Sequence, residues 1–246
     1  MSAGEPITFI VAVNDSRELK FNLLTSAVAD SPIHQWLLVD NHGNARYRNI
    51  SQLYCDAARD AKHDLMFFIH QDVYLPPTWE RQMYASLRQL EVLDPEWGVV
   101  GAVGVVPTHN GREKTLVGHW RDPHQYRHSQ DLPQEVQSLD EMWLGLRKRR
   151  SLSFDPRLPG FHCYGIDISL SAHARGLKSY ALDAFVWHKH RDACGKHIFF
   201  ADDSPKIRQR QTASFREEYR CATEYIRAKW QRFLPFHSTS YSWAID

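Results

Sequence analysis

Short apolar runs alternate with amphipathic segments along the N-terminal half of the chain. The runs are too short to span a membrane and are typical of strands buried on both faces of a parallel sheet. They cover residues 7–13, 35–39 and 65–69, and a fourth, glycine-containing run covers 98–106. Helical periodicity follows over residues 16 to about 27, about 51 to 62, and 79–90. This alternation predicts an α/β fold that is Rossmann-like, with a mostly parallel central sheet and flanking helices.

The pattern changes in the second half of the chain. Apolar periodicity disappears over residues 108–133, which are rich in His, Arg, Asp and Gly and are expected to form a long surface excursion. A strand and turn are expected over 136–146, a short helix over 167–174 that is closed by Gly176, and a last strand over 178–187.

A strong amphipathic helix is predicted near the C-terminus. Its apolar face carries Phe215, Tyr219, Ala222, Ile226, Trp230 and Phe233. We expect this face to pack against the domain, with a homodimer interface or contact with a membrane surface as the alternatives. The sequence thus predicts a single domain over residues 1–246, in which 209–246 form a C-terminal helical extension.

Composition narrows the classes of partner and of location. The formal net charge of the 246 residues is +1, so no strong field favours nucleic acid, and no nucleic-acid partner is expected. The four cysteines form no CxxC pair, which argues against a cysteine-based zinc site or a disulfide framework. The first residues lack the basic and apolar regions of a signal peptide. A cytoplasmic location is the resulting expectation.

Polar side chains follow the predicted strands, where open α/β sheets bind their ligands. The apolar run 65–69 ends in His70-Gln71-Asp72, and the last strand ends at His188. Asp72 and a histidine from a distant strand end could hold Mn²⁺ or Mg²⁺, whose remaining positions would take substrate phosphates. Asp167 could act as a general base, although capping of the short helix that starts there is a competing role.

An ordered set of motifs resembles one known family. The motifs are the segments 70–76, 99–105, 139–142, 154–156 and 160–170, followed by a strand that ends in His. Together they resemble glycosyltransferases of the GT-A fold, in the family-2-like branch that includes StrF-type proteins. The resemblance covers roughly Ile7 to His190.

The resemblance implies a role for each matching position. Donor-binding positions are Asn14, Asp15, Asp40, Gln71 and Asp72. Asp72 is the last carboxylate of an Asp-x-Asp element, and it shares the metal with His188. Asp140 and Glu141 match an acceptor-side position, and Asp167 matches the late acidic residue that serves as base in inverting members.

Two residues depart from the family pattern. His70 replaces the first carboxylate of Asp-x-Asp, which puts metal binding in doubt. Gly165 stands where relatives often carry Asp, which leaves Asp167 as the lone candidate base in that motif.

The predicted function is transfer of a sugar, with inversion, from a nucleoside-diphosphate donor to a hydroxyl acceptor. The resemblance favours a uridine diphosphate donor. The acceptor is a glycan, a lipid-linked sugar or a small molecule. One alternative is a nucleotide-sugar-binding module without catalysis. The other is a nucleotidyltransferase, against which the lack of glycine in Val13–Arg17 argues.

Overall fold

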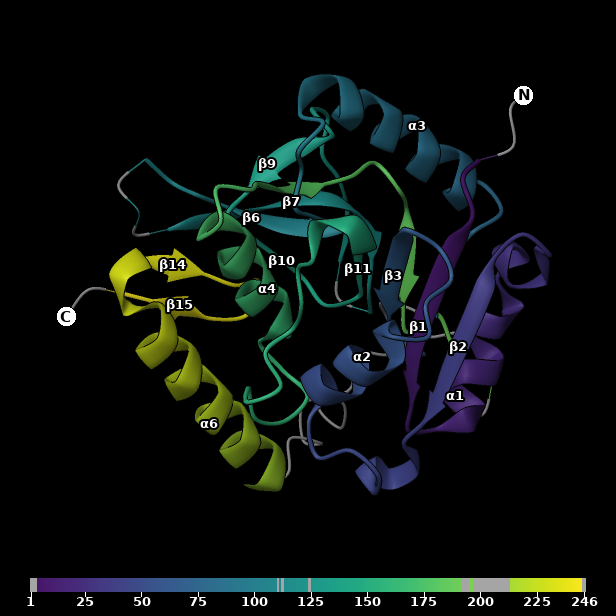
Figure 1. The fold of residues 1–246 in the computed structure, drawn as a ribbon, viewed down its shortest axis with the longest axis horizontal. Helices are drawn as coiled ribbons and strands as arrows, with labels where there is room; N and C mark the ends of the chain where they lie inside the picture. Colours follow the sequence, from purple (N-terminus) through teal and green to yellow (C-terminus); the bar gives the residue numbers. More distant parts are fainter. Residues whose placement is uncertain are drawn as a thin grey trace.

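The structure is a computed structural model that describes residues 4–109, 111, 113–123, 125–191, 195–196 and 213–244. A seven-stranded sheet forms the centre of this described part (Figure 1). Its strands, in spatial order, are β2 (Gln35–Asp40), β1 (Ile7–Val13), β3 (Leu65–Ile69), β11 (Trp143–Arg147), β5 (Val99–Gly101), β12 (Ser179–Ala181) and β9 (Gln134–Val136). The β2–β1, β1–β3 and β5–β12 pairs are parallel, whereas β11 and β9 run opposite to their neighbours. The predicted mostly parallel α/β sheet is thereby confirmed.

Helices cover both faces of this sheet, because successive strand residues point to opposite faces. They are α1 (Ser16–Phe21), α2 (Ile50–Ala58), α3 (Trp79–Leu93), α4 (Tyr164–His173) and α6 (Ala213–Trp230). Phe67 of β3 lies in one buried cluster with apolar residues of α1 and α3. The next residue, Phe68, lies in a second cluster with residues of α2, α4 and α6. The continuous apolar runs of the sequence therefore contribute side chains to two hydrophobic cores, one on each side of the sheet.

A second sheet lies beside the first and brings distant segments together. Its strands, in order, are β10 (Ser138–Leu139), β6 (Val103–Pro107), β7 (Lys114–Arg121), β13 (Val186–His188) and β4 (Val73–Tyr74), with β8 (Tyr126–His128) paired to β7. In the antiparallel β4–β13 pair, His188 lies opposite Val73. The strand that ends in His188 thus lies beside the loop that carries Asp72.

The structure corrects two predictions in this region. The run 98–106 is not one strand, because it breaks at Ala102 and its halves, β5 and β6, belong to different sheets. The predicted surface excursion over 108–133 instead contains β7 and β8. Trp120 of β7 is buried, and a Cβ atom at Gly118 would overlap the carbonyl oxygen of Ala102, the residue just before β6. Glycine at this position therefore permits the close β6–β7 approach.

Several element boundaries also differ from the predictions. Helix α1 ends at Phe21 and continues as two short 3₁₀ turns at Leu23–Thr25 and Ala27–Asp30. Helix α2 ends at Ala58 rather than near residue 62. The expected strand and turn over 136–146 are parts of β9, β10 and β11. Helix α4 begins at Tyr164, so Asp167 lies in its first turn and is not its N-cap.

Helix α6 packs against the domain through the predicted apolar stripe. Ala222, Ile226 and Trp230 are buried in the core that α4 also lines. Two short strands that the sequence analysis missed, β14 (Phe236–His237) and β15 (Ser242–Trp243), follow the helix and form a hairpin. Residues 209–212 of the predicted extension lie outside the described residues.

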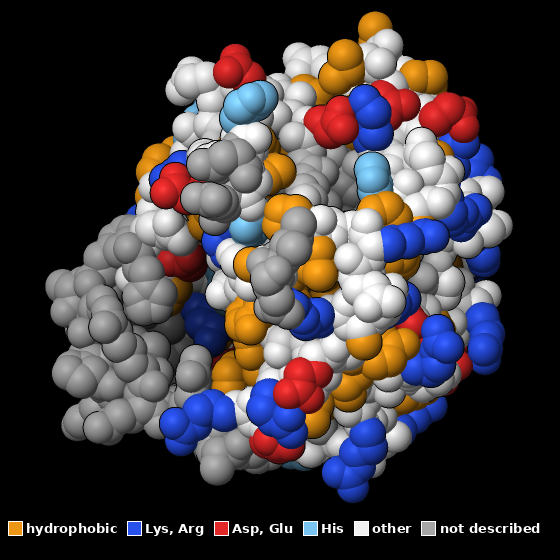
Figure 2. Space-filling view, turned by 90° about the vertical axis from the view of Figure 1, so that its left-hand side faces the viewer, with side chains coloured by type: hydrophobic (Ala, Val, Ile, Leu, Met, Phe, Trp, Pro, Cys, Tyr) orange, Lys and Arg blue, Asp and Glu red, His pale blue; other side chains and the backbone are white. Residues whose placement is uncertain are grey.

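Figure 2 shows the face that carries α6, where Lys and Arg side chains gather over the lower half. Among the described residues, no helix combines the length and apolar character needed to cross a membrane.

Candidate functional site

Hydrogen bonds of the Gln71 side chain link the end of β3 to the end of β1. Its side-chain oxygen accepts hydrogen bonds from the backbone N–H groups of Asn14 (3.0 Å) and Asp15 (3.2 Å). Its amide group donates to the side-chain oxygen of Asn14 and, at 3.3 Å, to Glu18. Because the Gln71 side chain is buried and engaged in these bonds, it fixes the loop that ends in Asp72.

Asp72 lies between two histidines at this edge of the sheet. Its Oδ2 atom is 3.3 Å from Nε2 of His188, and its Oδ1 atom is 3.8 Å from Nδ1 of His70. One ligand atom from each of the three residues can be chosen so that all lie within 4.8 Å of one another. The backbone strengthens the arrangement, since the N–H of Lys189 donates to the carbonyl oxygen of Asp72 at 2.8 Å. The structure therefore brings the predicted pair Asp72 and His188 together and adds His70.

The Tyr164 hydroxyl lies against the ring of His70. The Tyr164 hydroxyl donates to the backbone carbonyl of Glu141 at 3.2 Å and lies 2.6 Å from Nε2 of His70. With the hydroxyl proton on the Glu141 carbonyl, Nε2 carries the ring proton and donates to the tyrosine oxygen, which is one of the two tautomers that this contact allows. This leaves the lone pair of Nδ1 facing Asp72, which is the arrangement that second-shell partners give to metal-binding histidines.

The charges of the cluster favour a carboxylate and a neutral His70. Burial opposes ionisation of Asp72, but the neighbouring His188 charge outweighs it and holds the pKa of Asp72 well below its usual range. Burial lowers the pKa of His70. Burial would also lower the pKa of His188, yet Asp72 raises it above the ordinary value. An unprotonated carboxylate and a neutral imidazole are the forms that bind metal ions.

Two cavities meet at this cluster. The first, of about 430 Å³, lies over the ends of β1 and β3 and is lined by Asn14, Glu18, Asn41, Asn44, Tyr54, Gln71 and Glu218 among others. The second, of about 570 Å³, is lined by Asp140, Glu141, His188, Lys189, Tyr219, Thr239 and others. His70 and Asp72 line both cavities. A ligand in either cavity can therefore reach the same carboxylate and imidazole.

The donor-side residues expected from the resemblance divide into two groups. Asn14, Gln71 and Asp72 line the first cavity. Asp15 does not line it, because its side chain caps α1 through a 2.9 Å bond from the N–H of Arg17. Asp40 is exposed and accepts a 3.0 Å bond from the N–H of His42. The structure thus does not bring Asp15 or Asp40 into the cavity, in contrast to their expected nucleoside contacts.

The two residues that were expected on the acceptor side, Asp140 and Glu141, both line the second cavity. Asp140 accepts bonds from the N–H of Met142 (3.0 Å) and the hydroxyl of Thr239 (2.8 Å). Glu141 accepts a 3.2 Å bond from the N–H of Gly165 in the first turn of α4. Burial, together with the nearby Asp140 carboxylate, raises the pKa of Glu141 to about 8. Glu141 can therefore exchange a proton near neutral pH, whereas the engaged Asp140 side chain organises the loop.

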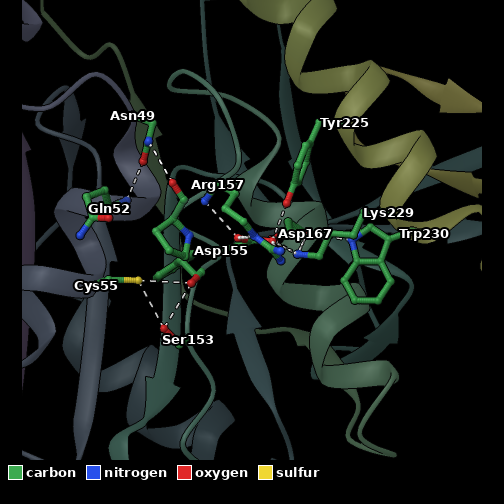
Figure 3. Close-up of polar contacts among 12 residues, drawn as sticks. Asn49, Gln52, Cys55, Ser153, Asp155, Arg157, Asp167, Tyr225, Lys229 and Trp230 are labelled. Atoms are coloured by element: carbon green, nitrogen blue, oxygen red, sulfur yellow. Dashed lines mark hydrogen bonds and ion pairs between the residues drawn. The ribbon is translucent and has the colours of Figure 1, made fainter.

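Asp167 lies on the side of α4 that faces α6 (Figure 3). Its side chain is 1% exposed and accepts bonds from Nζ of Lys229 (2.7 and 3.0 Å) and Nε1 of Trp230 (2.7 Å). It lines neither cavity. The structure therefore does not bring Asp167 to either cavity, because this carboxylate links α4 to α6.

Three further residues were not assigned a role by sequence reasoning. His70 was treated only as a lost carboxylate, although its position two residues before Asp72 is the signal that could have placed it in the cluster. Tyr164 orients His70, and nothing local in the sequence marks it. Asn41 lines the first cavity, and its side-chain oxygen accepts bonds from the N–H groups of Arg46 (3.1 Å) and Tyr47 (2.8 Å). It follows directly after β2, where a polar residue at a strand end was a usable signal.

Comparisons with known sequences give limited information. No protein-family model matches the chain. Over 127 residues the chain is 32% identical to the "ATP synthase subunits region ORF 6" protein of Fuscovulum blasticum. The match covers half of this chain and half of that protein. It is therefore a partial likeness that establishes no family.

Comparisons with solved structures concern the fold. TarS residues 1–349 from S. aureus align with 92% of this chain and 82% of that one, at 13% identity and a TM-score of 0.50. A longer TarS structure aligns at a TM-score of 0.46 and 13% identity over 74% of this chain, which corresponds to 36% of the TarS chain. The mannosyltransferase PcManGT from Pyrobaculum calidifontis, solved with GDP-Man and Mn²⁺, aligns at a TM-score of 0.47 and 13% identity over 76% of this chain and 57% of its own.

The likeness to TarS 1–349 identifies the architecture as a glycosyltransferase fold of the GT-A type, as the sequence predicted. At 13% identity it shows the fold alone. The narrower resemblance to StrF-type proteins stays a prediction.

Proposed function

We propose that the protein transfers a sugar from a nucleoside-diphosphate donor to a hydroxyl acceptor. The observation that carries this proposal is the cluster of His70, Asp72 and His188 at the junction of two cavities. One cavity offers room for a donor and the other for an acceptor, and each has the volume of an ordinary small-molecule site. A group-transfer reaction needs such a junction, because both substrates must meet at one reacting atom.

The first cavity is the donor site in this proposal. Its wall carries three acidic side chains, Glu18, Asp72 and Glu218, and burial followed by the Asp72 charge raises the pKa of Glu18. A diphosphate would be repelled by these groups unless a cation compensates them. His70, Asp72 and His188 fit a divalent ion, Mn²⁺ or Mg²⁺, which would supply positive charge to the leaving diphosphate. Lys189, at the edge of the second cavity, adds a further positive charge near this point.

The nucleoside would lie over the ends of β1 and β2. Asn14 and Asn44 offer amide groups there, Asn41 shapes the wall through its bonds to the 46–47 backbone, and Tyr54 offers an aromatic wall. Amide groups can pair with the edge of a base in both donor and acceptor directions. Uridine diphosphate is the proposed leaving group, on the strength of the family resemblance.

The second cavity is the acceptor site, and Glu141 is the proposed general base. A base works best when its pKa lies near the working pH, which a pKa of about 8 satisfies. Glu141 also opens onto the cavity that Asp72 and His188 border, whereas Asp167 does not. Deprotonation of an acceptor hydroxyl by Glu141 would allow a single displacement with inversion at the anomeric carbon. Glu141→Gln should then lower turnover by roughly 10²–10⁴-fold without weakening donor binding.

The experiment that tests the function is a two-stage assay. Calorimetric titration with UDP and GDP, each with and without Mn²⁺, establishes whether the first cavity binds a nucleoside diphosphate. Release of free nucleoside diphosphate from nucleotide sugars then supports a transferase, whereas pyrophosphate release supports nucleotidyl transfer. Binding without turnover supports a non-catalytic module, and no binding of either nucleotide contradicts the proposal.

Three points stay predictions. They are the class of the acceptor, a cytoplasmic location, and the partner of α6, which is a second copy of the chain or a membrane surface. The buried apolar stripe of α6 leaves mainly its charged side for such contacts, including Arg220, which pairs with Glu217 and Glu224.

A further inference from the structure

Two histidines and an aspartate meet on the second sheet, away from both cavities. His119 on β7 and His128 on β8 are directly opposite each other in an antiparallel strand pair. Asp183 comes from the segment between β12 and β13. None of the three lines either cavity at the Asp72 cluster. The proposed transfer reaction therefore does not account for this group.

The three side chains converge on one carboxylate oxygen. Oδ1 of Asp183 lies 2.6 Å from Nδ1 of His119 and 3.4 Å from Nε2 of His128. One ligand atom from each residue can be chosen so that all three lie within 4.8 Å. A tetrahedral zinc ion with bonds of 2.0–2.1 Å places its ligand atoms about 3.3 Å apart. The distances of 2.6 and 3.4 Å from Asp183 Oδ1 to the two histidine nitrogens are therefore close to the ligand separations of a zinc site.

The backbone holds two of the three ligands in place before any ion binds. The His119 side chain is 9% exposed, and its ring packs 4.9 Å from that of Phe185. The N–H of Asp183 donates to the Ser86 hydroxyl of α3 at 3.0 Å. Such preorganisation lowers the conformational entropy lost on binding.

We propose that His119, His128 and Asp183 form a binding site for Zn²⁺ or a similar borderline transition-metal ion. Two imidazole nitrogens and one carboxylate oxygen are typical zinc ligands, and water would take the fourth position. The ion would link the β7–β8 pair to the segment that leads into β13, the strand that ends in His188. The site would thus support the part of the sheet that positions the Asp72 cluster.

Binding requires two local changes, and both are small. The His119 and His128 rings are stacked, with 3.7 Å between centroids and 9° between planes, so one ion cannot lie in both ring planes at once. His128, whose side chain is 41% exposed, must turn its ring toward Asp183. Zn²⁺ must also take the place of the proton on Nδ1 of His119, and in the neutral ring this proton moves to Nε2.

The test uses Zn²⁺ alone, without nucleotide, on an Asp72→Asn variant that lacks the carboxylate of the first cluster. Calorimetric titration should give about one equivalent of bound Zn²⁺. Adding His128→Asn should weaken this binding at least about 100-fold. Saturating Zn²⁺ should raise the Tm of the single variant and not of the double variant.

The control replaces an exposed histidine outside the cluster. His173→Asn, at the end of α4, should leave zinc binding unchanged in the same background. If Asp72→Asn folds poorly, the wild type and His128→Asn provide the comparison, since the variant should bind one equivalent fewer. The proposal is overturned if Asp72→Asn binds no zinc, or if binding survives both His128→Asn and Asp183→Asn. The group would then be a hydrogen-bonded cluster only.

Discussion

The Nε2 atom of His188 lies 3.3 Å from Oδ2 of Asp72, and the antiparallel pairing of β13 with β4 holds the two side chains there. Neither residue depends on a long flexible loop for this contact. Asp72 immediately precedes β4, and His188 is the last residue of β13. A change in either side chain therefore alters the chemistry of the cluster more than the fold around it.

Asp72→Asn should greatly reduce Mn²⁺-dependent nucleotide binding. The variant removes the only carboxylate of the cluster among the described residues, while the amide keeps the size of the side chain and can still bond to His188. We expect the affinity for UDP in the presence of Mn²⁺ to fall at least about 100-fold, measured by calorimetric titration. The Tm without metal should fall as well, because the charged Asp72–His188 pair stabilises the folded state at neutral pH. Equal affinities of variant and wild type would remove Asp72 from the donor site.

His188→Ala should weaken the Mn²⁺ response less than Asp72→Asn does. Water or a phosphate oxygen can take the position of one imidazole, so we expect about a 10-fold loss of metal affinity. His70→Ala should have a similar effect, because Nδ1 of His70 lies 3.8 Å from the Asp72 carboxylate in the same cluster. Titration of Mn²⁺ at fixed UDP measures both variants against His173→Ala. A wild-type metal response in both would show that the histidines only support the loop.

Sequence patterns predicted the parts of the molecule that depend on local periodicity and on strand ends. The buried run 65–69 became β3, and the rule that ligands bind beyond strand ends placed Asp72 and His188 at one edge. β7 was missed because Gly118, His119 and Arg121 interrupt the apolar alternation. Its burial comes from pairing with β6 and β13, strands that are distant in the sequence.

The role of Asp167 was beyond sequence reasoning for a related reason. A carboxylate in the first turn of a helix can face a cavity or a neighbouring helix, and local sequence does not distinguish them. The packing of α6 determines which of the two Asp167 faces, because it brings Lys229 and Trp230 into contact with this carboxylate. The close approach of the Leu139 carbonyl oxygen and the Glu141 side chain to Gly165 is likewise set by tertiary packing.

Asp167→Asn should lower stability. The change breaks a buried ion pair with Lys229, although Lys229 keeps Asp155 as a partner at 2.8 Å. Breaking a buried pair costs about 3–5 kcal/mol, and the remaining partner should reduce this to about 2–3 kcal/mol. For a chain of this size the Tm should fall by roughly 4–12 °C.

Glu217→Gln is the control for Asp167→Asn, because Glu217 pairs with Arg220 on the exposed side of α6 and should leave the Tm unchanged. Calorimetric unfolding measures both variants. A stable Asp167→Asn protein that has lost turnover would instead restore Asp167 as the base.

Glu141→Gln should change how stability depends on pH. Burial raises the pKa of Glu141 to about 8 in the folded protein, above the value near 4.3 of an unfolded chain. The folded state therefore holds this proton more tightly, and the resulting stabilisation is complete below about pH 4.3 and is lost as the pH rises through 8. Glutamine is neutral at every pH and mimics the protonated form. The variant should match the wild type near pH 5 and exceed it at pH 9 by about 1–2 kcal/mol, or roughly 2–8 °C in Tm, after allowance for partial solvent contact.

Unfolding curves of wild type and Glu141→Gln at several pH values between 5 and 9 measure this difference directly. Comparison of the two proteins cancels the titration of the histidines, which both share. A constant difference across this range would mean that the Glu141 carboxyl titrates as an exposed group does. It would then be ionised throughout the range and, with a pKa near its ordinary value, a weaker base for an acceptor hydroxyl.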